Sequence, residues 1–401
     1  MIGLIVSSLS NKNSGPRVEE RIAMETIEIA EKLISFDTVS NKETGSIADF
    51  ISEFLEDEGF VIEQYPYIQK GVKKVNMIAK KGGHDTHFAL SGHMDTVPYD
   101  IRNWSTDPLF LTKKGNKYFG RGVCDMKGFL AVAMKAASYI QEHKLKKPFG
   151  LVFTSDEEVG CVGAKKLIND RGKFADTVLI GEPTELESYI LHKGYMYVKV
   201  ELKGKRVHSS RPNEGLNVVQ TALPLVLRKI NDFKRHLEVI SDPRFDPTYP
   251  TLNVGVVTTG DNSAKNIIAD YCRIELDIRP IPGQDVDDVF RAFSDFISVN
   301  EGIDDGLEVK VSFGRTPTPP METDTGSSLV KSVEKVSGKT SASTSFNTEG
   351  GVFNSAGIES VIYGPGSIQQ AHKPNEFMHE KYFSDKVVSQ YVRLIQDMCG
   401  K

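Results

Sequence analysis

The sequence has few cysteines and lacks any apolar run long enough to cross a membrane. Among 401 residues there are four cysteines, Cys124, Cys161, Cys272 and Cys399, and no two of them form a CxxC pair. This spacing suggests neither a disulfide framework nor a structural zinc finger, and so few cysteines in a chain of this length are typical of a reducing compartment. No stretch approaches the roughly 18 apolar residues that span a bilayer. We therefore expect a cytoplasmic protein without a membrane partner.

The sequence also lacks a strong excess of charge of either sign. Its 49 basic and 54 acidic residues give a net charge of −5, which offers no electrostatic reason to expect a nucleic-acid partner. At the N-terminus only residues 2–6 are mostly apolar, and no basic segment precedes them, so a signal peptide is not predicted. We expect residues 1–18 to form a flexible leader, and the alternative that the natural start is Met24 stays open.

What the sequence does contain is an alternation of helical and strand-like patterns. Apolar residues at helical spacing predict helices over residues 19–34, 41–59, 126–143, 327–337 and 384–398. Short β-rich runs predict strands over residues 60–65, 76–80, 87–91, 150–155, 177–180 and 361–363. This order indicates a layered α/β domain around a mostly parallel sheet. We assign residues 19–193 and 315–401 to that domain.

The pattern changes near Gly194. The segment MYVKVELKG alternates like a half-exposed strand. It is followed by a predicted helix, two strands, a helix and a strand, over residues 217–233, 251–258, 272–277, 286–298 and 307–313. The order β-α-β-β-α-β is that of a ferredoxin-like unit. We therefore expect residues 194–314 to form an inserted α+β domain.

The segment LSGHMDTVP places His93 and Asp95 at the end of an apolar strand, where open α/β sheets bind ligands. Residues two apart on a strand face the same way, and Asp95 can fix the tautomer of a metal-bound His93. Taken alone, an HxD motif is as often a surface pair without a role as it is part of a metal site. In GRGVCDMKGF, Asp125 lies in a turn before a helix, where a carboxylate either caps the helix or bridges two cations.

Three further segments carry candidate ligands or bases: Glu157 and Glu158 in TSDEEVG, Glu182 in LIGEPTE and His372 in GPGSIQQAHKPNEF. Each alone is more typical of a structural turn or a solvated acidic loop. However, four of the five segments follow apolar strands, so they converge on one rim of the sheet. Two histidines and three carboxylates suit zinc or a similar divalent ion. A carboxylate shared by two ions is the arrangement of two-metal hydrolysis.

These motifs and their spacing resemble the M20 family of metallopeptidases and deacylases, over nearly the whole chain. Asp125 follows His93 by 32 residues, Glu157 follows Asp125 by 32, and Glu182 follows Glu157 by 25. Within that family, the segments SGHMDTVPYD, NWSTDPLF, GVCDMKGF and GPGSIQQAHKPNEF are most similar to those of acetylornithine deacetylases. The resemblance implies the family's fold, with a catalytic domain and an inserted dimerisation domain.

The resemblance also implies two divalent metal ions, Zn²⁺ or Co²⁺. One ion would be held by His93, Asp125 and Glu182, and the other by Asp125, Glu158 and His372. Glu157 would be the general base, and Asp95 would orient His93. A cis peptide bond between Asp125 and Met126 is a frequent feature of the family.

Four residues beyond this set are candidates by the same resemblance. His208 in GKRVHSSRPNEG would reach the active site of a second subunit in a homodimer and steady the oxyanion. Asn266 and Arg279 match substrate-binding positions, and Arg279 could grip an α-carboxylate bidentately. A surface ion pair is nearly as plausible for Arg279. Glu349 in FNTEGGVFN could meet an α-ammonium group.

The expected activity is hydrolysis of the amide bond of a small-molecule N-acyl amino acid, with N2-acetyl-L-ornithine, an intermediate of arginine biosynthesis, as the leading candidate. The alternatives within the family are a succinyl-diaminopimelate desuccinylase, an aminoacylase or a dipeptidase. A different class, a binding protein that kept the fold and lost catalysis, is also an alternative. Such proteins typically lose ligands or the base, whereas all seven positions are present here.

Overall fold

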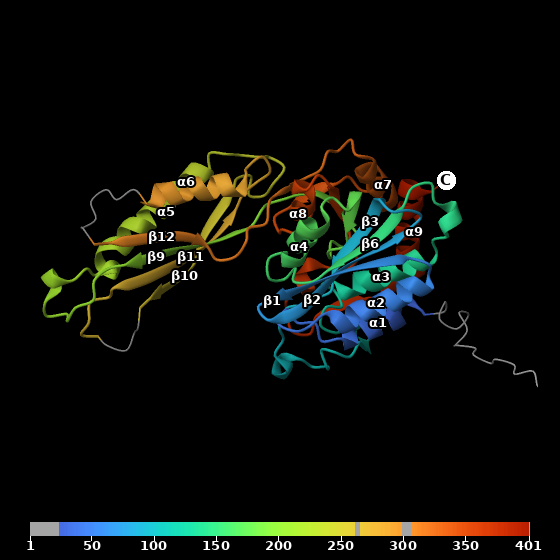
Figure 1. Cartoon of the computed structure of the whole chain (residues 1–401), viewed down its shortest axis with the longest axis horizontal. Helices are drawn as coiled ribbons and strands as arrows, with labels where there is room; N and C mark the ends of the chain where they lie inside the picture. The colour runs from blue at the N-terminus through green and yellow to red at the C-terminus, as the bar shows by residue number, and fades with distance from the viewer. Residues whose placement is uncertain (1–23, 261–264, 299–305, 401) are drawn as a thin grey trace, which may run out of the picture.

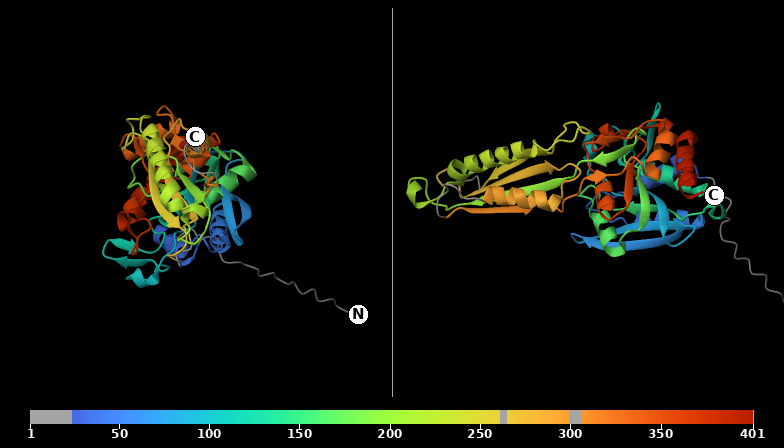
Figure 2. Two further views of the ribbon diagram at one scale, coloured as in Figure 1. Left: turned by 90° about the vertical axis from the view of Figure 1, so that its left-hand side faces the viewer. Right: turned by 90° about the horizontal axis from the view of Figure 1, so that it is seen from above.

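The computed structural model describes residues 24–260, 265–298 and 306–400. The predicted leader, residues 1–18, and the start of the first predicted helix lie outside the described residues. Two parts, each built on its own sheet, lie end to end along the long axis (Figures 1 and 2). In the described ranges, no helix has both the length and the apolar character that crossing a membrane requires.

The larger part is built on a nine-stranded sheet. Its four central strands lie in the order β6 (Phe149–Thr154), β3 (Thr86–His93), β7 (Ala175–Ile180) and β15 (Glu359–Ile362), and they run parallel. Beyond β6 lie β2 (Val72–Lys81) and β1 (Val61–Gln69), both antiparallel to their neighbours. Beyond β15 lie β8 (Tyr189–His192), β13 (Met321–Glu322) and β14 (Ala342–Thr344). The predicted α/β fold is confirmed.

Helices cover both faces of this sheet. One cluster of buried residues joins the sheet to α1 (Thr26–Ser35), α2 (Gly45–Asp57), α3 (Lys127–Ser138), α7 (Ser328–Ser337) and α9 (Asp385–Cys399). A second cluster joins the opposite face to α4 (Val162–Arg171) and α8 (Gly350–Ser355). Phe88 and Leu90 belong to the first cluster and Ala89 to the second, because successive strand residues point to opposite faces. Burial on both faces explains why these strands read as nearly continuous apolar runs.

A small third sheet was not predicted. It pairs β16 (Phe377–His379) with β5 (Lys117–Phe119), and β5 with β4 (Thr112–Lys114). Three-residue strands are too short to show a period of two in the sequence. Helix α3 is also shorter than predicted and ends at Ser138.

The smaller part contains the six elements of the predicted ferredoxin-like unit. They are β9 (Met196–Lys203), α5 (Leu223–Leu237), β10 (Thr251–Thr259), β11 (Tyr271–Arg279), α6 (Val286–Ser298) and β12 (Glu308–Phe313). The strands pair antiparallel in the order β10-β11-β9-β12. A short π-helix, Val218–Ala222, precedes α5, and Pro224 follows in the first turn of that helix.

We propose that residues 194–314 form a separate domain, because α5, α6 and the four strands share a core cluster of their own. Two residues within these bounds pack differently. Phe245 and Ile281 belong to the core of the larger part. The backbone of the connection between α5 and β10 also accepts hydrogen bonds from the buried Lys193, whose Nζ lies 2.8 Å from Pro247 O and 2.7 Å from Tyr249 O.

Candidate functional site

Four of the predicted metal ligands follow the central parallel strands at their carboxyl ends. His93 is the last residue of β3, Glu158 follows β6, Glu182 follows β7, and His372 lies in the loop after β15. Because neighbouring parallel strands end at the same edge of a sheet, these side chains share one rim. The structure therefore brings together segments that lie up to about 280 residues apart in the sequence.

Asp125 lies between the two histidines. Its Oδ1 is 3.1 Å from Nε2 of His93, and its Oδ2 is 3.4 Å from Nε2 of His372. Nε2 of His372 also lies 2.9 Å from Oε2 of Glu158, and Nε2 of His93 lies 3.9 Å from Oε1 of Glu182. Each oxygen of Asp125 thus faces a different His and carboxylate pair. The peptide bond from Asp125 to Met126 is cis.

The donor set fits a pair of divalent cations. Single ligand atoms of His93, Asp125 and Glu158 all lie within 4.8 Å of one another. Oε1 of Glu158 is buried and has no hydrogen-bond partner among the described residues. An unsatisfied buried carboxylate oxygen is costly, and a cation would satisfy it. Imidazole nitrogens combined with carboxylate oxygens suit zinc and similar ions.

Crowding of acidic groups perturbs their protonation. Burial, together with the charge of Asp125, raises the pKa of Glu158 to about 7 and the pKa of Glu182 well above its ordinary value. Burial and the charges of Glu349 and Asp95 raise the pKa of Glu157 to about 7, although His93 acts in the opposite direction. Like charges in one buried site disfavour ionisation. Cations placed between these carboxylates would offset that repulsion.

Asp125 and His372 shift in the complementary sense. Burial alone would raise the pKa of Asp125, but its hydrogen bonds with His372 and His93 outweigh burial and hold that pKa below its ordinary value. The hydrogen bonds of His372 with Asp125 and Glu158 raise its pKa to about 10. Asp125 is therefore the carboxylate of the group that stays ionised at neutral pH.

Asp95 contacts His93 differently from the expectation. Nδ1 of His93 donates to the backbone carbonyl of Asp95 over 2.9 Å, whereas the Asp95 carboxylate lies 3.7 Å from the same nitrogen. That carboxylate instead accepts the backbone N–H groups of Glu157 and Glu158, over 3.0 and 3.3 Å. It also accepts from the hydroxyl of Ser40 over 2.9 Å. The side chain of Asp95 thus fixes the loop that carries the two glutamates.

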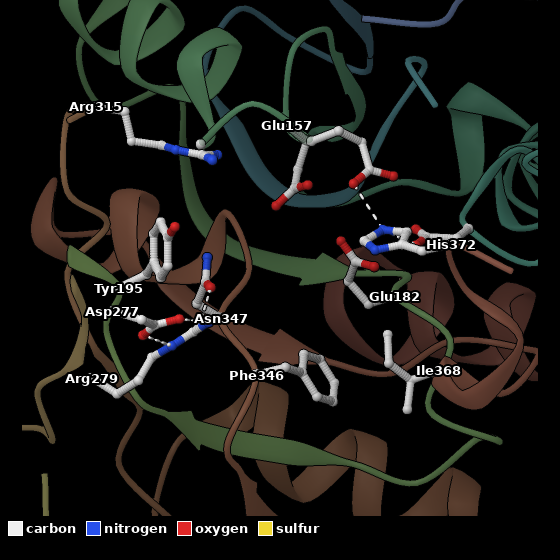
Figure 3. Close-up of a pocket in the computed structure, with 13 residues that line it drawn as sticks. Glu157, Glu182, Tyr195, Asp277, Arg279, Arg315, Phe346, Asn347, Ile368 and His372 are labelled. Carbon is white, nitrogen blue, oxygen red and sulfur yellow. Dashed lines mark hydrogen bonds and ion pairs between the residues drawn. The ribbon is translucent and has the colours of Figure 1, made fainter. Parts of the chain in front are cut away.

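The metal-ligand group opens into a cavity of about 320 Å³ that both parts line. At one end are the predicted base Glu157 with Asp125, Glu158, Glu182 and His372, and at the other are Tyr195, Asp277, Arg279, Arg315 and Asn347. Figure 3 shows Glu157, Glu182 and His372 on one side of the pocket, and Arg279, Tyr195 and Arg315 on the opposite side. Phe346 and Ile368 line the wall between them. The cavity can therefore hold a small molecule with chemically different ends.

Arg279 faces this cavity but is already paired. Its Nε and Nη2 donate to the two carboxylate oxygens of Asp277, over 2.7 and 3.0 Å, and its Nη1 donates to Asn347 Oδ1 over 2.9 Å. Glu349 is buried and is absent from the residues lining the cavity. It accepts from the Thr154 hydroxyl over 2.6 Å. Its role toward an α-ammonium group stays a prediction.

His208 and Asn266 lie away from this cavity. Strand β9 begins beside the larger part, at Met196 opposite Ile278, and ends at Lys203 opposite Tyr271. His208 follows that remote end, and its Nε2 is 3.5 Å from Nδ2 of Asn266. Neither residue lines the cavity of its own chain. Their predicted roles therefore require a second copy.

Glu376 is a residue of the site to which the sequence assigned no role. Its buried carboxylate accepts from Arg121 Nη1 and from the backbone N–H groups of Gly122, Cys124 and Asp125, over 2.8 to 3.0 Å. It thereby ties the His372 loop to the Asp125 turn. Its position four residues after His372, in the same quoted segment, was the available signal.

Comparison with known proteins adds to this geometry. Residues 89–397 match the sequence pattern of peptidase family M20/M25/M40. The chain is 35% identical to an acetylornithine deacetylase of Myxococcus xanthus over 351 residues. This match covers 86% of this chain and 90% of the relative. It is 32% identical over 381 residues to an acetylornithine deacetylase of Buchnera aphidicola, covering 93% of this chain and 98% of the relative.

Solved structures agree on the fold. An M20 family metallo-carboxypeptidase of Sulfolobus solfataricus superposes with a TM-score of 0.69 at 21% identity, covering 94% of this chain and 99% of that one. The likeness extends over both parts of the molecule.

Proposed function

The chain belongs to peptidase family M20/M25/M40, and we propose that it is a two-metal deacetylase that hydrolyses N2-acetyl-L-ornithine to L-ornithine and acetate. Family membership makes it a metal-dependent hydrolase of amide bonds. The observation that carries the two-metal proposal is the position of Asp125, whose two oxygens face His93 and His372 separately. The substrate is supported by the relatives, which are acetylornithine deacetylases at 32–35% identity.

We assign the ligands in two overlapping sets. His93, Asp125 and Glu182 would hold one ion, and Asp125, Glu158 and His372 the other, because these are the groups that the contacts join. Zinc and cobalt both suit this donor set. A bound pair would polarise the amide carbonyl and make water acidic enough to ionise near neutral pH.

Glu157 is the proposed general base. It lines the cavity beside the ligands, where its carboxylate can accept a proton from water and donate it to a leaving group. Its carboxylate takes the proton of the attacking water while the water oxygen bonds to the amide carbon. It then delivers that proton to the leaving nitrogen as the carbon–nitrogen bond breaks. Two contacts hold Glu157 in place. The Cys161 thiol donates to Glu157 Oε1 over 3.3 Å, and the Asp95 carboxylate accepts the backbone N–H of Glu157.

We also propose a homodimer formed through the smaller part. No described strand pairs with the outer edge of β10, where Val256 and Val257 are 48% and 43% exposed. An open edge with exposed apolar side chains favours pairing with another strand. A second copy would also bring His208 to the cavity of its partner, where it would stabilise the oxyanion. All four cysteines are unpaired, which supports a cytoplasmic location. The acetylornithine deacetylase relatives support a place in arginine biosynthesis.

The deciding experiment is a hydrolysis panel on protein reconstituted with Zn²⁺ or Co²⁺. We expect N2-acetyl-L-ornithine to give the highest kcat/KM, above N-succinyl-diaminopimelate, other N-acetyl amino acids and a dipeptide. A higher kcat/KM on one of the others would replace the substrate and keep the reaction class. Metal-loaded protein that hydrolyses none of them would contradict the deacetylase proposal.

A further inference from the structure

We propose that Arg315 binds a carboxylate of the substrate, at the end of the cavity opposite the metal ligands. The inference rests on the proposed function and deepens it, because it names a residue that would bind the carboxylate of the proposed substrate. Arg315 lies just after β12, where the chain returns from the smaller part to the larger one. No motif in the sequence pointed to it.

The two ends of the cavity carry side chains of opposite charge. Its acidic end contains four carboxylates, of Asp125, Glu157, Glu158 and Glu182, which the proposed metal pair would neutralise. The other end contains two guanidinium groups, Arg279 and Arg315, and one carboxylate, Asp277. Figure 3 shows these two ends facing each other across the pocket. A substrate bound with its amide at the acidic end would direct another polar group toward the guanidinium groups.

Arg279 contributes little net charge to that end. Asp277 accepts from two of its nitrogens, and Asn347 accepts from a third. The Arg279–Asp277 pair is therefore neutral as a unit, and a substrate carboxylate would have to compete with a bidentate ion pair already in place. Arg279 remains able to position Asn347 and to pack against Tyr195, whose ring lies 4.5 Å from its guanidinium carbon.

Arg315 supplies the uncompensated positive charge. No carboxylate among the described residues forms an ion pair with it, and its neighbours are the rings of Tyr195 and Tyr197, 5.5 and 5.8 Å from its guanidinium carbon. Aromatic faces stabilise a guanidinium group without neutralising it. Figure 3 shows this group directed into the pocket, toward the side where Glu157 lies. Its hydrogen-bond donors remain available to a bidentate carboxylate.

The backbone around Arg315 is built to hold this position. The stem of Arg315 passes so close to Gly160 that a Cβ atom there would lie 2.9 Å from Arg315 Cδ. Gly160 belongs to the loop of Glu157, and its N–H donates to Glu157 O over 2.8 Å. Lys165 donates to Gly160 O and Thr316 O, over 2.7 and 3.0 Å, which joins the two segments. Arg315 is thus placed relative to the proposed base.

The test compares a substrate with and without its carboxylate. We would measure kcat and KM for N2-acetyl-L-ornithine and for N2-acetyl-L-ornithinamide, using the wild type, Arg315→Gln and Arg291→Gln. Arg291 is a matched control, because it is an exposed arginine of α6 that pairs with Asp288 outside the cavity. We expect Arg315→Gln to lower kcat/KM for the acid by about 10- to 100-fold, mainly through KM. For the amide the change should be less than about threefold, and Arg291→Gln should change neither.

Equal losses on the acid and the amide would overturn the carboxylate assignment, because they would indicate a structural role. If the wild type hydrolyses neither compound, the proposed substrate is contradicted, but the role of Arg315 can still be tested by ligand binding. In that case calorimetric binding of L-ornithine and L-ornithinamide provides the readout. We then expect Arg315→Gln to weaken only the binding of L-ornithine, and the absence of any preference for the acid in the wild type would overturn the inference.

Discussion

The carboxylate of Asp95 accepts the backbone N–H of Glu157, with 3.0 Å between Asp95 Oδ1 and Glu157 N. Two motifs 62 residues apart are joined by this bond, and the same carboxylate accepts the N–H of Glu158 over 3.3 Å. The side chain of Asp95 thus fixes the loop that carries Glu157 and Glu158, while the backbone carbonyl of Asp95 fixes the ring of His93. A change at Asp95 should therefore disturb ligand geometry and base geometry together.

Replacing Asp95 with Ala removes the acceptor for both amides. We expect metal affinity or kcat to fall by about 10- to 100-fold, the usual effect of losing a group that orients metal ligands. Activity assays and metal titration would measure this loss. Asp100→Ala is the control, since Asp100 forms an exposed ion pair with Arg102 and should leave both quantities unchanged. Normal metal affinity and kcat in Asp95→Ala would show that the loop of Glu157 and Glu158 keeps its conformation without these two hydrogen bonds.

Replacing Glu157 with Gln removes the proposed proton carrier and keeps its shape. We expect kcat to fall by about 10²- to 10⁴-fold, with metal content at the wild-type level by elemental analysis. Glu158→Gln is the contrasting variant, because it alters a proposed ligand and should also lower metal content. Near-normal turnover by Glu157→Gln would remove this residue from the mechanism.

Metal binding at pH 7 should release protons. The pKa values of Glu158, about 7, and of His372, about 10, mean that both groups are protonated to a large extent before metal binds. Ligands bind metal in their deprotonated forms, so apparent affinity should rise as pH rises from about 5 to 8. Calorimetry in buffers with different ionisation enthalpies counts the protons released. Affinity that is constant over this range would contradict the predicted shifts.

Glu376 should matter for stability as well as for the site. Glu376→Ala leaves the Arg121 guanidinium and three backbone N–H groups without their acceptor. Removing one partner of a buried ion pair costs about 3–5 kcal/mol of unfolding free energy. Urea unfolding would measure this. Glu380→Ala, four residues away, breaks only an exposed pair with Lys113 and should cost less than about 1 kcal/mol. Similar midpoints for the two variants would refute this role.

The proposed role of His208 can be tested by mixing subunits. His208→Ala and Glu157→Ala should each be nearly inactive as pure proteins. If His208 acts on the neighbouring active site, refolding the two variants together creates one intact site per mixed dimer. Random mixing yields half mixed dimers, so about a quarter of the wild-type activity should return. A mixture with no more activity than its components would argue that His208 acts elsewhere or not at all.

Much of the fold could be predicted from the sequence because the relevant patterns are local. The strands before His93 and Glu182 contain the apolar runs 88–90 and 178–180, because the central strands are buried on both faces, and each ligand follows its run by two or three residues. The ferredoxin-like order of the smaller part followed from period-two and helical patterns in the same way. Convergence of the ligands required only that neighbouring parallel strands end at one edge.

Tertiary structure decided what no local pattern carries. The bonds of Asp95 to Glu157 and of Glu376 to Cys124 join residues 62 and 252 positions apart, and they depend on which loops the strand order brings side by side. The same holds for Arg315. Its charge is uncompensated because Asp277, the carboxylate at that end of the cavity, pairs with Arg279. Residue type and spacing determined which chemistry is present, whereas the packing of distant segments determined which groups are paired and which remain free to act.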